Sequence, residues 1–449
     1  PLVTPGLQTP FPLPADSLDG KIKNTLFDVS LTSRPIAKLF VKLNYHYNEH
    51  DNTTPDRIFV YTPGDTLSQV LIPSGQIPED VNSTYIRTNP VPGIRENRFN
   101  VDADYPLMRG LSLRGFYEYK KTDYRPAEDE LRSDTHVNEI GAELKFRGNP
   151  LVNGYVKYVY DERRGSDFST NRPYEALVTP PTLAASIFDT NPTTRQFFVA
   201  DYNQNRIKAQ ATITPGESPF AVQLMGDWWK RDYKGPNCGG SNDQLLLNQT
   251  PPLVFPSECL GLQDAQGQTY TLDAQYTTAQ DVNLYAFVTW SRYDTNQHGR
   301  SFSSVSNPAT IAQSVDPNRD WNADSRTTDT GVGAGFDWKP FGKPYSAGVQ
   351  YLYNDGITAI SESAGPALTP PLPIPDAKNT LNSLQVYGRW QYSKNVLFRA
   401  NYWYQHLRAE NWAYDNATPT SSNNVLLTGQ SSGGYTAHVF GISVAYTNW

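Results

Sequence analysis

The chain has 449 residues and a formal net charge of −7, and 18% of its residues are charged. This mild charge provides no polybasic patch, which argues against nucleic-acid binding. No stretch approaches the roughly 18 consecutive apolar residues of a membrane-spanning helix, so a helical membrane protein is excluded. Tyr occurs 28 times and Trp 9 times, whereas Met and Cys occur twice each. Such aromatics suit β-strands and membrane interfaces, in a barrel or in an extracellular β-sandwich.

Apolar residues recur at every second position in long segments. In residues 37–48, for example, Leu39, Val41, Leu43 and Tyr45 alternate with mostly polar neighbours. Ordinary strands average about 5 to 6 residues, whereas a tilted strand that crosses a membrane needs about 9 to 11. The alternation therefore predicts membrane-length β-strands, which keep the mean hydropathy as low as −0.56 because only one face is apolar.

Fifteen strands are expected along the chain. They cover about residues 25–31, 37–48, 98–105, 111–120, 137–146, 152–160, 197–214, 220–228, 268–276, 282–290, 327–338, 345–353, 384–392, 396–404 and 435–446. Short turns rich in Gly, Pro, Asn and Asp alternate with long loops, here residues 49–97, 124–134, 161–196, 233–267, 295–326, 355–379 and 411–434. Short periplasmic turns and long extracellular loops are the topology of bacterial outer-membrane barrels.

This pattern predicts an all-β fold, a large antiparallel transmembrane β-barrel, with two parts. Residues 1–24 form a Pro-rich opening segment, and residues 25–449 form the barrel. Single-chain bacterial barrels have even strand numbers. Since the first expected strand already runs towards the periplasm, we expect the sequence to be the C-terminal part of a longer barrel.

Charged residues of both signs recur on the polar faces of the expected strands. A water-filled lumen would tolerate them, and a lumen packed around another protein would use them as pairing partners. The candidates for lumen-facing partner contacts are Lys38, Lys42, Arg114, Glu118, Glu139, Glu143, Lys145, Lys157, Arg389 and Arg399.

The two cysteines, Cys238 and Cys259, lie in one polar segment rich in Pro and Gly. A pair within one loop favours a disulfide in an oxidising compartment, with reduced bystander thiols as the alternative. No Cys-x-x-Cys-His motif is present, so the chain binds no c-type haem of its own. We also expect no metal site and no catalytic residue.

Alternating carboxylates and amides occupy the expected loop 295–326: Asp316, Asn318, Asp320, Asn322 and Asp324. Such hard oxygen ligands suit Ca²⁺, but the loop lacks the glycine and the closing glutamate of the EF-hand cage. An ordinary solvated loop is therefore the favoured interpretation.

Several segments resemble the decahaem-associated outer-membrane barrels of the MtrB/PioB type. The most specific are residues 14–21 (PADSLDGK), 28–35 (DVSLTSRP) and 47–55 (YNEHDNTTP); residues 100–105 and 441–446 are similar to more generic barrel sequence. The resemblance spans nearly the whole chain. Members of that family also have an N-terminal part with further strands and a Cys-x-x-Cys, neither of which this sequence contains.

The resemblance implies a bacterial outer-membrane barrel that encloses a periplasmic multihaem cytochrome, often meets a second one outside, and lets electrons cross the membrane. Haem c would then be carried by the partner cytochrome, and the barrel would supply insulation and alignment without enzymatic activity. The alternative is a diffusion porin or a substrate-specific channel.

Overall fold

The computed structural model describes the strands of the protein and many of their connections. The described residues are 15–55, 57–60, 86–88, 93–125, 132–148, 151–166, 199–216, 218–233, 261–278, 281–301, 313, 316–411 and 433–446. Among them, no helix is long and apolar enough to span a bilayer.

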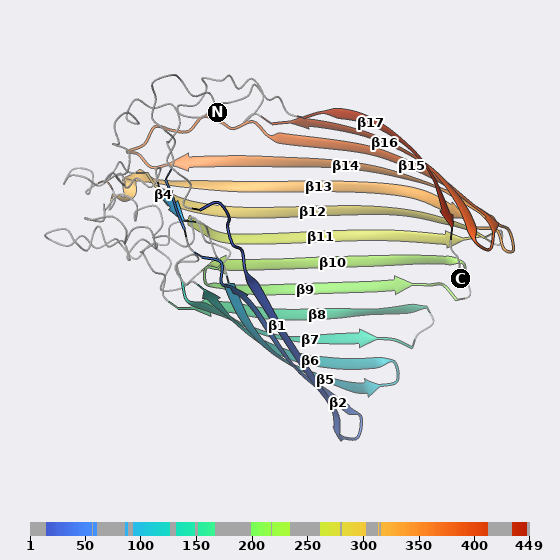
Figure 1. Ribbon diagram of the computed structural model, residues 1–449, viewed down its shortest axis with the longest axis horizontal. Helices are drawn as coiled ribbons and strands as arrows, with labels where there is room; N and C mark the ends of the chain where they lie inside the picture. The colour runs from blue at the N-terminus through green and yellow to red at the C-terminus, as the bar shows by residue number, and fades with distance from the viewer. Residues whose placement is uncertain are drawn as a thin grey trace.

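Fifteen strands form one antiparallel sheet in chain order (Figure 1). They are β1 (Ile22–Ile36), β2 (Leu39–Asn52), β5 (Gly93–Met108), β6 (Leu111–Arg125), β7 (Asp134–Phe146), β8 (Val152–Gly165), β9 (Tyr202–Ile213), β10 (Phe220–Tyr233), β11 (Gly261–Thr277), β12 (Val282–Arg300), β13 (Asp320–Trp338), β14 (Tyr345–Ala364), β15 (Ala377–Ser393), β16 (Val396–Glu410) and β17 (Tyr435–Tyr446). The predicted all-β antiparallel fold is confirmed, with one sheet strand for each of the fifteen expected segments.

The strands run further towards the extracellular side than the sequence predicts. β13 begins at Asp320 and β14 continues to Ala364, so much of the expected loops 295–326 and 355–379 is strand. A separate ribbon, β3 (Ile58–Val60) with β4 (Ile86–Thr88), lies within the expected loop 49–97. The prediction missed these parts because both faces of a strand are polar above the membrane, so the apolar alternation disappears there.

The first turn also differs from its prediction. Pro35 lies inside β1, at a register shift between Ser33 and Ile36, where an irregularity tolerates the missing N–H group of proline. The turn itself is Ala37–Lys38, and Lys38 has a φ of 72°. Lys38 is therefore a turn residue, and its predicted place on the polar face of a strand is wrong.

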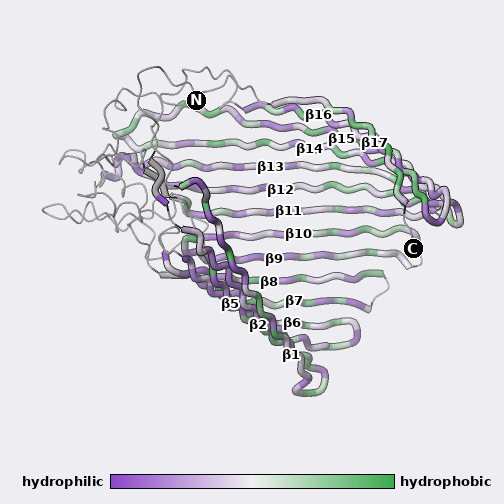
Figure 2. Tube along the Cα trace, viewed as in Figure 1, coloured by the Kyte–Doolittle hydropathy of each residue, from purple (hydrophilic) through white to green (hydrophobic). Residues whose placement is uncertain are grey.

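The register divides the sheet into an apolar and a polar face. Leu224, Leu272, Val288 and Val332 stand directly beside one another across β10 to β13, and each is between 38% and 45% exposed. A continuous apolar row that no other part of the described chain covers requires an apolar medium, which for a membrane barrel is lipid. Figure 2 shows hydrophobic and hydrophilic segments alternating along the strands.

A repeated tyrosine–asparagine contact marks the extracellular border of the apolar face. In four strand pairs, a tyrosine hydroxyl on an ascending strand donates to an asparagine Oδ1 on the descending strand beside it. The pairs are Tyr45–Asn97 (2.8 Å), Tyr117–Asn138 (2.8 Å), Tyr158–Asn205 (2.7 Å) and Tyr351–Asn382 (2.9 Å). A ring in the apolar layer with its hydroxyl held at the polar edge is the arrangement of an interfacial aromatic girdle.

The sheet curls along its width, and its two outermost strands are β1 and β17 (Figure 1). Each of these edge strands pairs with one neighbour among the described residues. Since β1 and β17 both run from the extracellular to the periplasmic side, pairing them directly would make a parallel contact in an otherwise antiparallel sheet.

Candidate functional site: the polar face of the sheet

Nine of the ten predicted lumen-facing residues share one face of the sheet, called the inner wall below. The register places them opposite one another or on equivalent alternate positions: Lys42, Arg114, Glu118, Glu139, Glu143, Lys145, Lys157, Arg389 and Arg399. In an outer-membrane barrel, the face opposite the lipid lines the lumen. Whether these residues contact a partner remains a prediction.

Charges on β5 to β7 form one network on the inner wall. The Nε of Arg114 donates to Oδ1 of Asp102 at 2.9 Å, and its Nη1 lies 3.9 Å from Glu143 Oε2. Lys145 Nζ lies 3.1 Å from the other oxygen of Glu143. The Glu143 carboxylate thus bridges two cations, which allows it to be nearly buried in the wall.

A second network covers β8 to β10. Arg206 forms an ion pair with Asp227, and Lys208 Nζ lies 3.6 Å from the same carboxylate. Further towards the extracellular side, Gln204 links two groups, because its Nε2 donates to Asp161 and its Oε1 accepts from Arg231 Nη2 at 2.8 Å. The strands are thereby joined by side chains as well as by backbone hydrogen bonds.

Aromatic rings also stabilise cations on this wall. Lys157 Nζ lies 4.2 Å from the ring centre of Phe116. Arg163 and Arg231 approach Tyr202 to 4.5 and 4.3 Å from its ring centre. Such cation–π contacts are favourable by about 0.5 to 2 kcal/mol each, so these rings help to hold the wall cations in place.

Five aromatic side chains of the inner wall lie over a glycine on the neighbouring strand. The directly opposed pairs are Phe116–Gly141, Trp229–Gly267, Tyr285–Gly335, Phe287–Gly333 and Tyr387–Gly348. A Cβ at position 267 would lie 2.5 Å from Trp229 Nε1, and one at position 348 would lie 2.5 Å from Tyr387 Cε1. The rings can therefore lie along the wall and leave the space in front of it free. The sequence prediction missed these pairs because they appear only once the register is known.

The acidic segment proposed for Ca²⁺ is structured differently from its prediction. Asp316 caps the short 3₁₀ helix Pro317–Arg319, and Asp320 and Asp324 belong to β13. Asp320 Oδ2 accepts from Arg300 Nη2 at 3.0 Å, and Asp324 accepts from Asn296 at 2.6 Å. The expected solvated loop is therefore wrong here. Within the described ranges, no group of three or more His, Cys, Asp or Glu residues could hold a metal ion. Cys238 and Cys259 lie outside the described residues.

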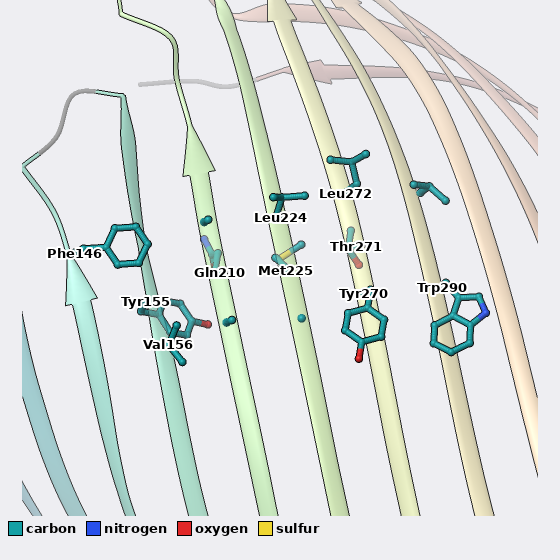
Figure 3. Close-up of a pocket in the computed structure, with 14 residues that line it drawn as sticks. Phe146, Tyr155, Val156, Gln210, Leu224, Met225, Tyr270, Thr271, Leu272 and Trp290 are labelled. Carbon is teal, nitrogen blue, oxygen red and sulfur yellow. The ribbon is translucent and has the colours of Figure 1, made fainter.

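The apolar face has a shallow groove of about 500 Å³. Its floor is formed by small residues such as Ala209, Ala211 and Gly226, and Figure 3 shows Phe146 on one side and Trp290 on the other. Since it lies on the lipid-facing side, this groove is separate from the inner wall.

These features define an outer-membrane β-barrel protein, and comparison with known proteins agrees. Residues 5–247 and 255–447 match the family model described as "Putative outer membrane beta-barrel porin, MtrB/PioB". The chain therefore belongs to the MtrB/PioB family of outer-membrane barrels and is located in the outer membrane. The family description names a porin and no class of enzyme.

Among curated proteins, the chain is similar to "Outer membrane protein MtrB" of Shewanella baltica (strain OS185). The two are 23% identical over 447 residues, which cover 99% of this chain and 54% of that protein. The chain thus spans about half the length of its curated relative.

Solved structures give weaker similarities. A mutant of the ferric enterobactin receptor PfeA of Pseudomonas aeruginosa aligns with a TM-score of 0.40 and 10% identity, covering 98% of this chain and 71% of that one. A loop-deletion mutant of OmpT of Vibrio cholerae aligns with a TM-score of 0.25 and 12% identity, covering 95% and 99%. Scores this low support no argument about function.

Proposed function

We propose that this barrel encloses a multihaem c-type cytochrome and insulates it from lipid, so that electrons cross the outer membrane along the haems. The observation that carries the proposal is the inner wall, where many charges of both signs are already ordered in networks such as Arg114–Asp102–Glu143. A polar wall of this kind suits a hydrated protein surface, whereas the apolar face suits lipid.

The width of the sheet supports the proposal, because it suits a barrel wide enough to enclose another protein. Fifteen strands about 4.8 Å apart give an arc of about 70 Å. Antiparallel closure between β1 and β17 needs an odd number of further strands, because both edge strands run the same way. Barrels of 16 to 18 strands already leave an aqueous channel, and the curated relative is about twice as long as this chain.

The chain itself offers no haem attachment, since its two cysteines have twenty residues between them and no Cys-x-x-Cys-His occurs. Haem iron would therefore belong to the partner, and the residues of the barrel would exclude lipid and align the partner. This division of roles also matches the resemblance to decahaem-associated barrels.

The test is electron transfer across proteoliposomes that contain a trapped redox dye. Vesicles with the intact barrel and its co-purified cytochrome should reduce or oxidise the dye when a redox partner is added outside. Vesicles with the barrel alone should not. The family description favours a second candidate function, a diffusion porin. If the barrel binds no cytochrome and passes small solutes freely, the porin function replaces the electron conduit.

A further inference from the structure

The short turns at the periplasmic side are strongly basic, although the whole chain has a net charge of −7. The sequences of these seven turns contain the basic residues Lys38, Arg109, Arg147, Lys339, Lys343 and Lys394 and the acidic residues Glu217 and Asp281. Asp281 Oδ2 accepts a hydrogen bond from the backbone N–H of Phe341 at 2.6 Å. Its carboxylate is therefore already engaged with the backbone of the neighbouring turn.

Two arginines extend this charge onto the inner wall. Arg389 on β15 and Arg399 on β16 stand directly opposite each other, near the turn Lys394–Asn395. The six basic turn residues together with Arg389 and Arg399 are called the basic rim below. Like charges directly opposite across two strands are destabilising. An anion bound between the two guanidinium groups would relieve the repulsion between Arg389 and Arg399.

The basic rim differs in its pairing from the charge networks on β5 to β10 of the inner wall. Within the described part of the chain, none of its eight members forms an ion pair with a carboxylate. Elsewhere, basic residues such as Arg114, Arg206 and Lys145 do so. Arg389 instead stacks on Tyr387, with its Cζ 5.1 Å from the ring centre. The chain therefore leaves positive charge free at one end of the barrel.

We propose that the basic rim docks an acidic, carboxylate-bearing face of the periplasmic cytochrome, an inference that rests on the proposed function. Two adjacent guanidinium groups suit carboxylates, which they bind through paired N–H donors. Arg389 and Arg399 lie on the polar face, away from the bilayer, which favours a protein carboxylate over a lipid headgroup as their partner. A cluster of unpaired charge at the mouth also accelerates the encounter with an oppositely charged protein.

The experiment measures binding of the co-purified multihaem cytochrome to the intact barrel in zwitterionic nanodiscs, at several salt concentrations. Arg389→Gln with Arg399→Gln should weaken binding about tenfold at low salt and flatten the salt dependence. The matched control is Arg292→Gln with Arg326→Gln, which removes the same charge on the lipid-facing side, where both arginines pair with Asp294. This control should bind like the wild type. A heat-dependent gel shift confirms that each variant is folded.

The outcomes separate the two proposals. If the wild-type barrel binds no cytochrome, the proposed function fails and the rim proposal with it. If the wild type binds and the rim variant binds equally well, only the rim proposal is overturned. If the rim variant loses affinity only in nanodiscs that contain anionic phosphatidylglycerol, the rim serves lipid headgroups and the proposal is likewise overturned.

Discussion

On the lipid-facing side, the medium that a residue meets depends on its height along the strand. Val288 on β12 lies in the apolar row. Arg292 lies four positions further along the same face, and its Nε is 2.7 Å from Asp294 Oδ2. Arg326 on β13 shares that carboxylate at 2.8 Å. The change from aliphatic to ion-paired residues locates the extracellular edge of the bilayer independently of the tyrosine–asparagine contacts.

An arginine on the apolar face should be costly, and more so the nearer it lies to the bilayer midplane. Leu43→Arg or Val288→Arg should lower the free energy of unfolding by about 2 to 4 kcal/mol if the residue lies near the bilayer midplane. Lys42→Ser, on the inner wall beside Leu43, should cost far less. Urea titrations of the protein folded into lipid vesicles measure both. Equal losses would mean that the two faces are assigned the wrong way round.

The glycines beneath the wall aromatics should tolerate no side chain. Gly267→Ala places a Cβ 2.5 Å from Trp229 Nε1, so the indole must move. We expect a loss of about 1 to 3 kcal/mol from overpacking. Gly115→Ala is the control, because nothing lies within 4 Å of its added Cβ. The same vesicle titration applies, and replacement of Trp229 by alanine should remove most of the difference between the two glycine variants.

Among elements, one buried arginine connects the extracellular ends of β7, β8 and β9. Arg132 Nε donates to the Ser166 carbonyl at 2.9 Å, and its Nη1 donates to the Val199 carbonyl at 2.6 Å and to Asp201 at 3.0 Å. Its side chain is 0% exposed. Burial raises the pKa of the Asp201 carboxyl, and the neighbouring Arg132 opposes this rise.

Removing one partner of this pair should destabilise these strand ends. Arg132→Ala leaves the Asp201 carboxylate buried without its cation, and breaking such a pair costs about 3 to 5 kcal/mol. The double variant Arg132→Met with Asp201→Leu removes both charges and should lose much less. Hydrogen exchange at the extracellular ends of β7 to β9 is the measurement. A double variant as unstable as Arg132→Ala would contradict the electrostatic explanation.

The predicted disulfide between Cys238 and Cys259 concerns the connection between β10 and β11. A bond that closes a loop with twenty residues between its cysteines should stabilise the protein by about 3 kcal/mol in the chain-entropy model. Intact mass before and after reduction is the direct test. Two free thiols in protein isolated without reductant would disprove the bond.

At the scale of the whole molecule, the direction of the edge strands determines how the barrel can close. Edges left unpaired in hydrocarbon would expose backbone N–H and C=O groups, each at a cost of several kcal/mol. β1 and β17 run in the same direction, so direct closure between them would be parallel, whereas antiparallel closure would need an odd number of further strands.

Cross-linking can test this closure. In a background with both native cysteines changed to serine, Ala400→Cys with Ile442→Cys should form a disulfide, because these residues are opposed on β16 and β17. Val29→Cys on β1 with Ile442→Cys should form none in the folded, intact barrel. A disulfide between these two strands would show that they are neighbours and that the barrel closes without intervening strands.

Much of the architecture could be predicted from the sequence. A period of two reveals a strand and its two faces wherever one face meets lipid and the other meets water. This is why fifteen strands, their alternating connections and the polar face of residues such as Arg114 and Lys157 were all predictable. Lys38 was misplaced because the nearby proline suggested a turn that the strand instead accommodates as an irregularity.

Only the tertiary structure decided which residues touch across the strands. Periodicity assigns Arg114 and Asp102 to one face, but their ion pair depends on the register between β5 and β6. The same holds for Trp229 over Gly267 and for Arg389 opposite Arg399. The alternation of a strand is local, whereas register is a relation between two strands, set by the turn and the packing that join them. For this protein, the sequence alone therefore determined the barrel class and its two faces. The pairing of the strands determined which side chains of the inner wall contact one another.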